Sequence, residues 1–192
     1  MAGDSQGAMD MATERWEIDS SHSGIHFSVR HLVIAKVRGQ FGRWSGTVLV
    51  PDGDFERASV DVAIDASSIN TGVADRDTHL KSADFFDVAT YPEISFRTDR
   101  VEPAGNGRLR LVGQLTIKGV TRQVAFDVEA HGKAADPWGN LRAAFTAKTS
   151  VDRRDFGLTW NQVLETGGVM VGERVDIEVD LEAVQQTAAK VA

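Results

Sequence analysis

Residues 109–128, LRLVGQLTIKGVTRQVAFDV, carry the pattern that decides the fold. Apolar side chains occupy alternate positions before and after the central Lys118-Gly119 pair: Leu109, Leu111, Leu115 and Ile117, then Val124, Phe126 and Val128. A period of two is typical of a half-buried strand, and a glycine in such a place allows a tight reversal. This stretch therefore predicts two antiparallel strands joined by a short turn.

The same alternation recurs along most of the chain, in the segments 15–18, 25–29, 37–50, 60–64, 94–96, 141–147 and 175–181. Turn residues separate these segments, among them Asp52-Gly53 and the cluster 136–140. Seven or eight strands predict an all-β domain, either a sandwich or a barrel. Four glycines lie inside the strands, at Gly39, Gly42, Gly46 and Gly113. Glycine in a strand commonly marks a bulge or a sharp bend, so we expect a closed antiparallel barrel.

One segment, Thr71–Asp87, lacks the alternation. Asn70 or Thr71 can cap a helix, Asp75 is placed near its start and Lys81 near its end, as the helix dipole favours. We expect a short helix over 73–82, inserted between two strands. The remaining organisation is simple: a disordered tail over 1–13, one barrel domain over 14–184 and a C-terminal tail over 185–192.

Composition excludes several classes of function. The chain has 192 residues and no cysteine, so disulfides, thiol nucleophiles and cysteine-based zinc sites are ruled out. Its formal net charge of −7 argues against nucleic-acid binding, which depends on basic surfaces. The N-terminus has no pattern of a secretory signal, and no apolar run is long enough to span a bilayer. We therefore expect a cytoplasmic protein without an integral membrane segment.

Histidines offer one candidate for metal binding. His22 and His26 are four residues apart, so that on one strand they could point to the same side. However, His26 alternates with the apolar Ile25 and Phe27, and no third ligand has a fixed spacing. Ordinary surface histidines are the favoured interpretation, and no metal site or cofactor is predicted.

Two charged clusters offer a candidate for catalysis. Asp75, Asp77 and His79 form one of them, and Asp152 and Asp155 belong to the other. Acid–base chemistry would require both clusters to meet at one pocket. No standard catalytic or phosphate-binding motif occurs, so solvated charges are favoured and no catalytic residue is predicted.

Aromatic residues are spread over almost every strand, with nine Phe, four Trp and one Tyr. An eight-stranded barrel has an interior just large enough for side chains or for one ligand. From the residues alone, a filled core and a ligand-holding core are both open.

Four ordered blocks resemble the YceI-like family of lipocalin-like polyisoprenoid-binding proteins over about 16–184. The blocks are WEIDSSHSGIHFSVRHL (16–32) with VRGQF (37–41), RDTHLKSADFFD (76–87) with YPEISF (91–96), LTIKGVT (115–121), and RRDFGL (153–158) with VGERV (171–175). The resemblance implies an extended eight-stranded antiparallel barrel with an inserted helix and an apolar tunnel. It implies non-catalytic binding of a long-chain polyisoprenoid, such as an isoprenoid quinone or a similar amphiphilic lipid, for carriage or storage, and a homodimer. Many relatives carry a signal peptide, whereas we expect none here, because residues 1–13 show no such pattern.

Two sets of residues are candidates for contact with such a ligand. The predicted tunnel lining is Phe27, Val29, Phe41, Phe85, Phe96, Leu115, Ile117, Phe126, Phe145, Phe156 and Trp160. The predicted mouth residues are His22, Arg30, His79 and Arg154. Two alternatives stay open: an enzyme, hydrolytic or other, that uses the Asp and His clusters at the barrel mouth, and an interaction module with a fully packed barrel.

Overall fold

The fold was analysed in a computed structural model, which describes residues 13–32, 35–163 and 169–186. Its strands are β1 (Thr13–Ile18), β2 (Gly24–His31), β3 (Ala35–Phe41), β4 (Trp44–Pro51), β5 (Ser59–Asp65), β6 (Ile69–Asn70), β7 (Glu93–Pro103), β8 (Arg108–Ile117), β9 (Val120–Ala135), β10 (Leu141–Asp152) and β11 (Val171–Gln186). The helices are α1 (Ala74–Lys81) and three short 3₁₀ turns, η1 (Phe55–Arg57), η2 (Ala66–Ser68) and η3 (Arg153–Phe156).

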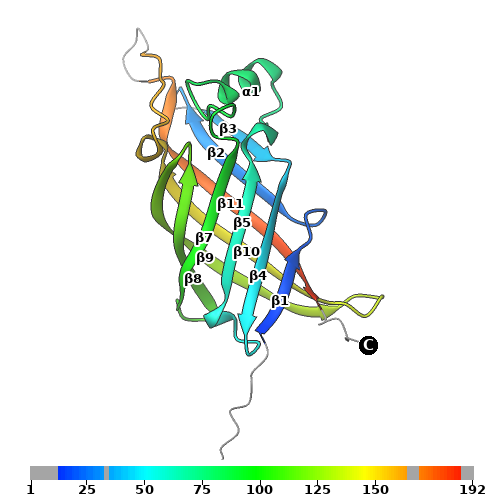
Figure 1. Cartoon of the computed structure of the whole chain (residues 1–192). Helices are drawn as coiled ribbons and strands as arrows, with labels where there is room; N and C mark the ends of the chain where they lie inside the picture. Colours follow the sequence, from blue (N-terminus) through cyan, green and yellow to red (C-terminus); the bar gives the residue numbers. More distant parts are fainter. Residues whose placement is uncertain (1–12, 33–34, 164–168, 187–192) are drawn as a thin grey trace, which may run out of the picture.

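Eight strands form a closed antiparallel barrel (Figure 1). Their order is β1-β4-β5-β7-β8-β9-β10-β11, and β1 pairs with both β4 and β11, which closes the ring. The long strand β11 pairs with β1 near its end and with β2 over its earlier part, and β3 and β6 continue the sheet from β2. The predicted barrel is confirmed, and closure removes the edges that an open sheet would expose.

Alternate side chains fill the barrel in two apolar clusters. The cluster at the α1 end, called here the upper end, includes Phe96 and Phe126, whose rings meet edge to face with centroids 5.2 Å apart. The cluster at the opposite, lower end is built around Trp16 and Val50, both fully buried. Successive residues of each strand therefore point alternately to the inside and to the outside of the barrel, which explains the predicted period of two.

Two hairpin turns follow the residues that predict them. Lys118 and Gly119 have φ angles of 50° and 73°, and Asp52 and Gly53 have φ angles of 59° and 72°. Two successive residues with positive φ match the right-handed twist of the flanking strands, which is why Asp-Gly and Lys-Gly suit these positions.

Helix α1 lies within the predicted range, but its predicted cap is wrong. Val73 occupies the N-cap position and makes no side-chain cap hydrogen bond. Instead, the Asp77 carboxylate accepts hydrogen bonds from the Thr71 backbone N–H, at 2.9 Å, and from the Thr71 hydroxyl, at 2.6 Å. The Arg76 guanidinium of α1 in turn donates to the Thr71 hydroxyl, at 2.7 Å, and to the Thr71 carbonyl oxygen, at 2.9 Å, so Thr71 is tied to the helix through side chains and is not its N-cap.

Strand pairing extends slightly beyond the predicted domain boundaries. Thr13 is the first residue of β1 and pairs with Pro51, and Gln186 ends β11 opposite Arg15. The rest of the two predicted tails, 1–12 and 187–192, lies outside the described residues.

Gly113 is required by a close approach of β7, and its replacement should destabilise the fold. A Cβ atom at Gly113 would lie 2.4 Å from the Arg97 carbonyl oxygen and 2.6 Å from the Phe96 ring. We expect Gly113→Ala to lower the free energy of unfolding by about 2–3 kcal/mol, because backbone cannot move aside as a flexible side chain can. Gly42→Ala is the control, since its Cβ would come no closer than 3.7 Å to another atom. Urea unfolding of both variants measures this, and equal losses would contradict it.

Candidate ligand-binding cavity

The upper half of the barrel encloses an apolar cavity of about 180 Å³. Side chains from strands around the barrel converge on it, including Val62 of β5, Leu115 of β8 and Val179 of β11. They converge because each lies on the inward-facing set of its strand. Such a space can hold hydrocarbon, because its wall is apolar apart from Arg153 and His26.

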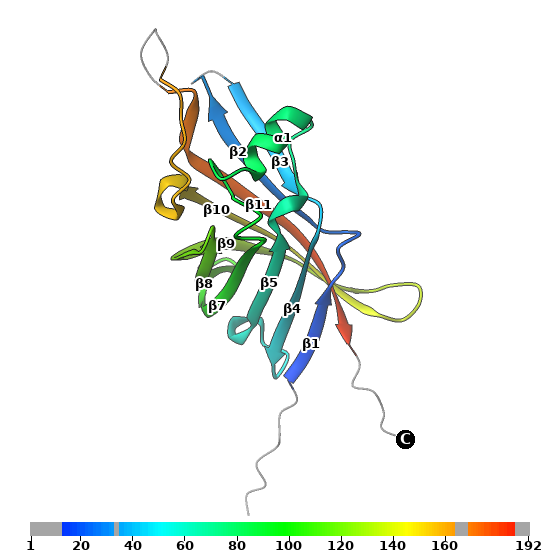
Figure 2. The ribbon, with the colours of Figure 1, turned by 45° about the horizontal axis from the view of Figure 1, so that its top comes forward.

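Helix α1 lies at the upper end of the barrel (Figures 1 and 2), and aromatic side chains pack there against the cavity. Phe86 lies edge to face with Phe41, with ring centroids 6.0 Å apart. His79 of α1 lies edge to face with both Phe85, at 5.1 Å, and Trp160, at 4.6 Å. The cover is therefore a packed aromatic cluster carried by one short helix and two loops.

A second apolar cavity of about 90 Å³ occupies the lower half of the barrel. Among the described residues, Leu181 is the one that lines both cavities. Phe55 closes the lower cavity and packs on Phe145 at 5.2 Å and on Trp16 at 5.8 Å. The Lys133 Nζ atom lies 4.6 Å from the Phe55 ring centroid, a cation–π contact that covers this end.

A closed barrel with an apolar interior fits one known family. The model of the YceI-like domain matches residues 16–183. The chain belongs to the YceI-like family.

Known proteins agree with this assignment. A UPF0312 protein of Staphylococcus aureus is 38% identical over 165 residues, which cover 85% of this YceI-like chain and 94% of that protein. The YceI protein of Campylobacter jejuni is 28% identical, with a TM-score of 0.69 over 82% of this chain and 90% of that one.

Two more distant structures share the fold. BcnA of Burkholderia cenocepacia has a TM-score of 0.75 at 23% identity, covering 86% of this chain and 98% of its own. A polyisoprenoid binding domain from Saccharophagus degradans, implicated in plant cell wall breakdown, has a TM-score of 0.67 at 15% identity, covering 89% and 98%.

Most predicted lining residues surround one of the two cavities of this YceI-like protein. The upper cavity is lined by Phe27, Val29, Phe41, Phe85, Leu115, Ile117, Phe126 and Phe156, and the lower by Phe145. Phe96 is instead packed behind Phe126, and Trp160 behind Phe85. The wall also contains residues that the prediction omitted, among them Ile64, Ile177 and Leu181, although the same alternation marks them.

The four predicted mouth residues do not form one group. His79 lies over the aromatic cover and bonds through Nε2 to the Asp84 carboxylate at 2.9 Å. Arg30 is exposed on β2, next to the inward-facing Val29. Arg154 is exposed and forms ion pairs with the carboxylates of Asp152 and Glu173, away from both cavities. His22 lies in the turn before β2, beside Asp19.

Arg153, the neighbour of Arg154, is the charged residue that sequence reasoning missed. Its side chain is 4% exposed and lines the upper cavity. The guanidinium donates to four backbone carbonyls, those of Leu158, Trp160 at 2.9 Å, Val171 at 3.4 Å and Gly172 at 2.9 Å. Burial lowers the pKa of Arg153, and Asp152 and Glu173 oppose this shift. Arg153 therefore ties the segment after η3 to the start of β11.

His22 approaches carboxylates but not His26. The ligand atoms of His22, Asp19 and Glu182 lie within 4.8 Å of one another. The Arg142 guanidinium already donates to both of these carboxylates, at 2.9 Å for Asp19. Hydrogen bonds from Ser21, Arg142 and His22 hold the pKa of Asp19 well below its usual range. The group is thus a charge network around an arginine. The shared strand assumed for His22 and His26 is wrong, since β2 begins at Gly24.

Asp136 supports the β9–β10 turn and should make stability depend on pH. Its carboxylate accepts hydrogen bonds from Asn140, Arg142 and the Trp138 backbone N–H, and these lower its pKa to about 2. Because the folded pKa lies below that of an unfolded aspartate, about 3.9, this stabilisation is complete above that value and is lost as the pH falls toward 2. Urea unfolding at several acidic pH values should show a smaller pH dependence for Asp136→Asn than for the native protein. Equal dependence would contradict this assignment.

The charged clusters considered for catalysis do not converge. Asp152 and Asp155 border a cleft outside the barrel, which none of Asp75, Asp77 and His79 lines. Asp77 is engaged with Thr71, and neither cluster lines the upper or the lower cavity. Within the described part of the chain, no helix is both long and apolar enough to cross a membrane.

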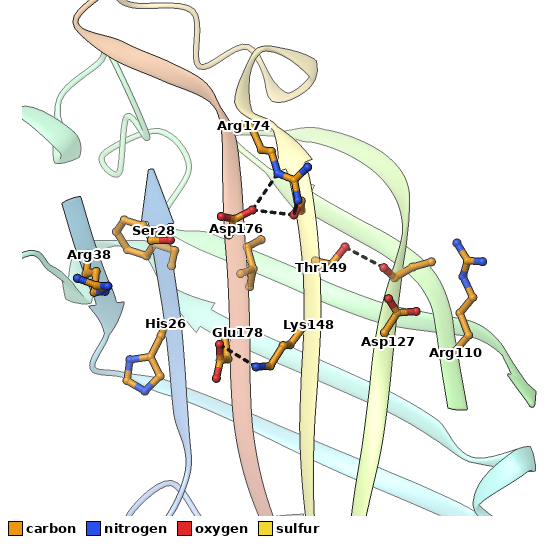
Figure 3. A pocket seen from close by; sticks show the side chains of 15 residues that line it. His26, Ser28, Arg38, Arg110, Asp127, Lys148, Thr149, Arg174, Asp176 and Glu178 are labelled. Atoms are coloured by element: carbon orange, nitrogen blue, oxygen red, sulfur yellow. Dashed lines mark hydrogen bonds and ion pairs between the residues drawn. The ribbon is translucent and has the colours of Figure 1, made fainter. Parts of the chain in front are cut away.

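A polar groove of about 690 Å³ runs over the outer face of β3, β2, β11, β10, β9 and β8 (Figure 3). Lys148 pairs with Glu178 at 3.3 Å, and Arg174 with Asp176 at 2.9 Å, across and along the strands. Hydrogen bonds from Arg174 and Ser150 lower the pKa of Asp176. These mutual pairs are typical of a solvated sheet face.

Proposed function

We propose that this protein binds the apolar chain of a polyisoprenoid lipid, such as an isoprenoid quinone, inside the barrel without catalysis, for carriage or storage. The observation that carries the proposal is the cavity with a largely apolar wall in the upper half of the barrel. Burial of hydrocarbon is favourable by about 0.8 kcal/mol per methylene, which needs no charged anchor.

The two cavities, as they stand, hold only part of a long prenyl chain. On the scale of a roughly 150 Å³ cavity that accommodates benzene, the 180 Å³ and 90 Å³ cavities hold about seven and four carbons. Eleven buried carbons contribute roughly 9 kcal/mol, which lies within the estimated cost of association, about 4–15 kcal/mol. Tight binding therefore requires a longer chain that displaces side chains such as Leu181 and joins the two cavities.

The two alternatives are less well supported. An enzyme would need several reactive groups at the cavity, and the described wall is apolar except for two residues: Arg153, whose guanidinium is engaged by carbonyls, and His26, which is exposed and also lines the outer groove. A packed interaction module would have a filled interior, whereas this barrel has space at both ends. The cytoplasmic location and the homodimer stay predictions.

The decisive experiment is mass spectrometry of an organic extract of the purified protein, followed by titration of the delipidated protein with a C20 to C50 series of prenols. We expect a co-purifying isoprenoid lipid and saturable binding that strengthens with chain length. Absence of both would overturn the proposal.

A further inference from the structure

Strands β9 and β10 pair over only part of their length. Their register runs from the Leu141–Ala135 pair to the Lys148–Asp127 pair. Beyond this point, β9 residues pair with β8 and β10 residues pair with β11, but not with each other. The two strands diverge toward the upper end of the barrel (Figure 2), and the wall there has no backbone ladder.

A cleft of about 440 Å³ lies in this gap. Side chains of both signs of charge line this cleft: Arg110 and Arg122 are positive, and Asp155 is negative. One side chain bridges the gap: the Thr149 hydroxyl of β10 donates to the Ala125 carbonyl oxygen of β9 at 2.8 Å (Figure 3).

The cleft and the upper cavity share wall residues. Val151 and Phe156 line both spaces. Phe156 is 1% exposed and is the last residue of η3, a short turn that begins after Asp152. One layer of side chains, with Phe156 as its largest member, therefore separates the outside from the cavity.

We propose that the β9–β10 gap is a lateral portal, through which a prenyl chain enters the upper cavity while its polar head group stays in the cleft. This inference rests on the proposed function. Entry between strands that are paired would break backbone hydrogen bonds, and entry at the α1 end would dismantle the aromatic cover. Entry through the gap requires only that Phe156 turn aside and that the Thr149 bridge open.

A reversible crosslink tests the portal. The chain has no cysteine, so in the double variant Ala125→Cys/Thr149→Cys only the two introduced thiols can join. The measured quantity is the rate at which the delipidated protein takes up geranylgeraniol. We expect oxidation to slow uptake by about tenfold or more, as for other gated sites, and reduction to restore it. Phe156→Ala and Thr149→Val should accelerate uptake in the protein without introduced cysteines.

The matched control places the same crosslink where the strands are paired, in Glu129→Cys/Thr146→Cys. Oxidation there should leave the uptake rate unchanged. The portal is overturned if both crosslinks slow uptake equally, or if neither the 125–149 crosslink nor the two accelerating variants change the rate. A protein that takes up no geranylgeraniol in any state instead refutes the proposed function.

Discussion

Replacement of Arg153 by methionine should lower the free energy of unfolding by about 3–5 kcal/mol. Methionine has a similar apolar stem but no donor, so the buried Leu158 carbonyl and the part-buried carbonyls of Trp160 and Gly172 would lose their donor. A carbonyl that is removed from water and has no hydrogen-bond donor destabilises the folded state by its full desolvation penalty. Here several carbonyls would carry this penalty together. Urea unfolding followed by circular dichroism measures the change.

Arg154→Gln is the matched control, because the two arginines are adjacent but opposite in environment. Arg154 is exposed and its ion pairs are with surface carboxylates, so its loss should change stability little. Arg153→Lys should be intermediate, since one ammonium cannot reach carbonyls on both segments as a planar guanidinium does. If the Arg153→Met and Arg154→Gln variants have similar free energies of unfolding, the hydrogen bonds from Arg153 to the backbone carbonyls do not stabilise the segment after η3.

Replacement of Val179 by tryptophan should reduce prenol affinity by roughly 100-fold or more, since denying about four carbons of contact removes roughly 3 kcal/mol. Val179 faces the upper cavity from the middle of β11, so the added ring fills space that the ligand would use. Fluorescence or calorimetric titration with one long prenol measures the affinity, and thermal unfolding confirms the fold. Val62→Phe, from β5, provides a second obstruction if the first variant is unstable.

Glu178→Trp places the same bulk on the next residue of the same strand, facing the outer groove. If the ligand lies inside the barrel, this variant should bind prenol as the native protein does. Loss of binding in Glu178→Trp with normal binding in Val179→Trp would move the site to the outer groove.

Alternation alone predicted much of this fold. The inward faces of the strands, the tight turns at Asp52-Gly53 and Lys118-Gly119, and helix α1 all depend on neighbours in sequence. Local sterics and a period of two set them, which is why they could be derived without knowing which strands pair.

Side-chain roles at the ends of the barrel could not be derived in this way. Arg153 and Arg154 are adjacent and chemically identical, and the turn of η3 buries one and exposes the other. Gly39 was expected to mark a bend; instead, a Cβ there would lie 2.3 Å from the Phe27 ring, so the glycine makes room for an aromatic neighbour. Such contacts join residues that only strand pairing brings together.

The sequence by itself thus determined an all-β domain of strands with apolar inward faces, because every strand carries its own alternating pattern, and the in-strand glycines and the resemblance to the YceI-like family added the expectation of a closed barrel. Only the tertiary structure decided how that interior is divided, by Leu181 into two cavities, and where its wall is thin, between β9 and β10. Register and strand divergence depend on packing between distant segments, and a pattern of period two is the same whether a strand has one neighbour or two.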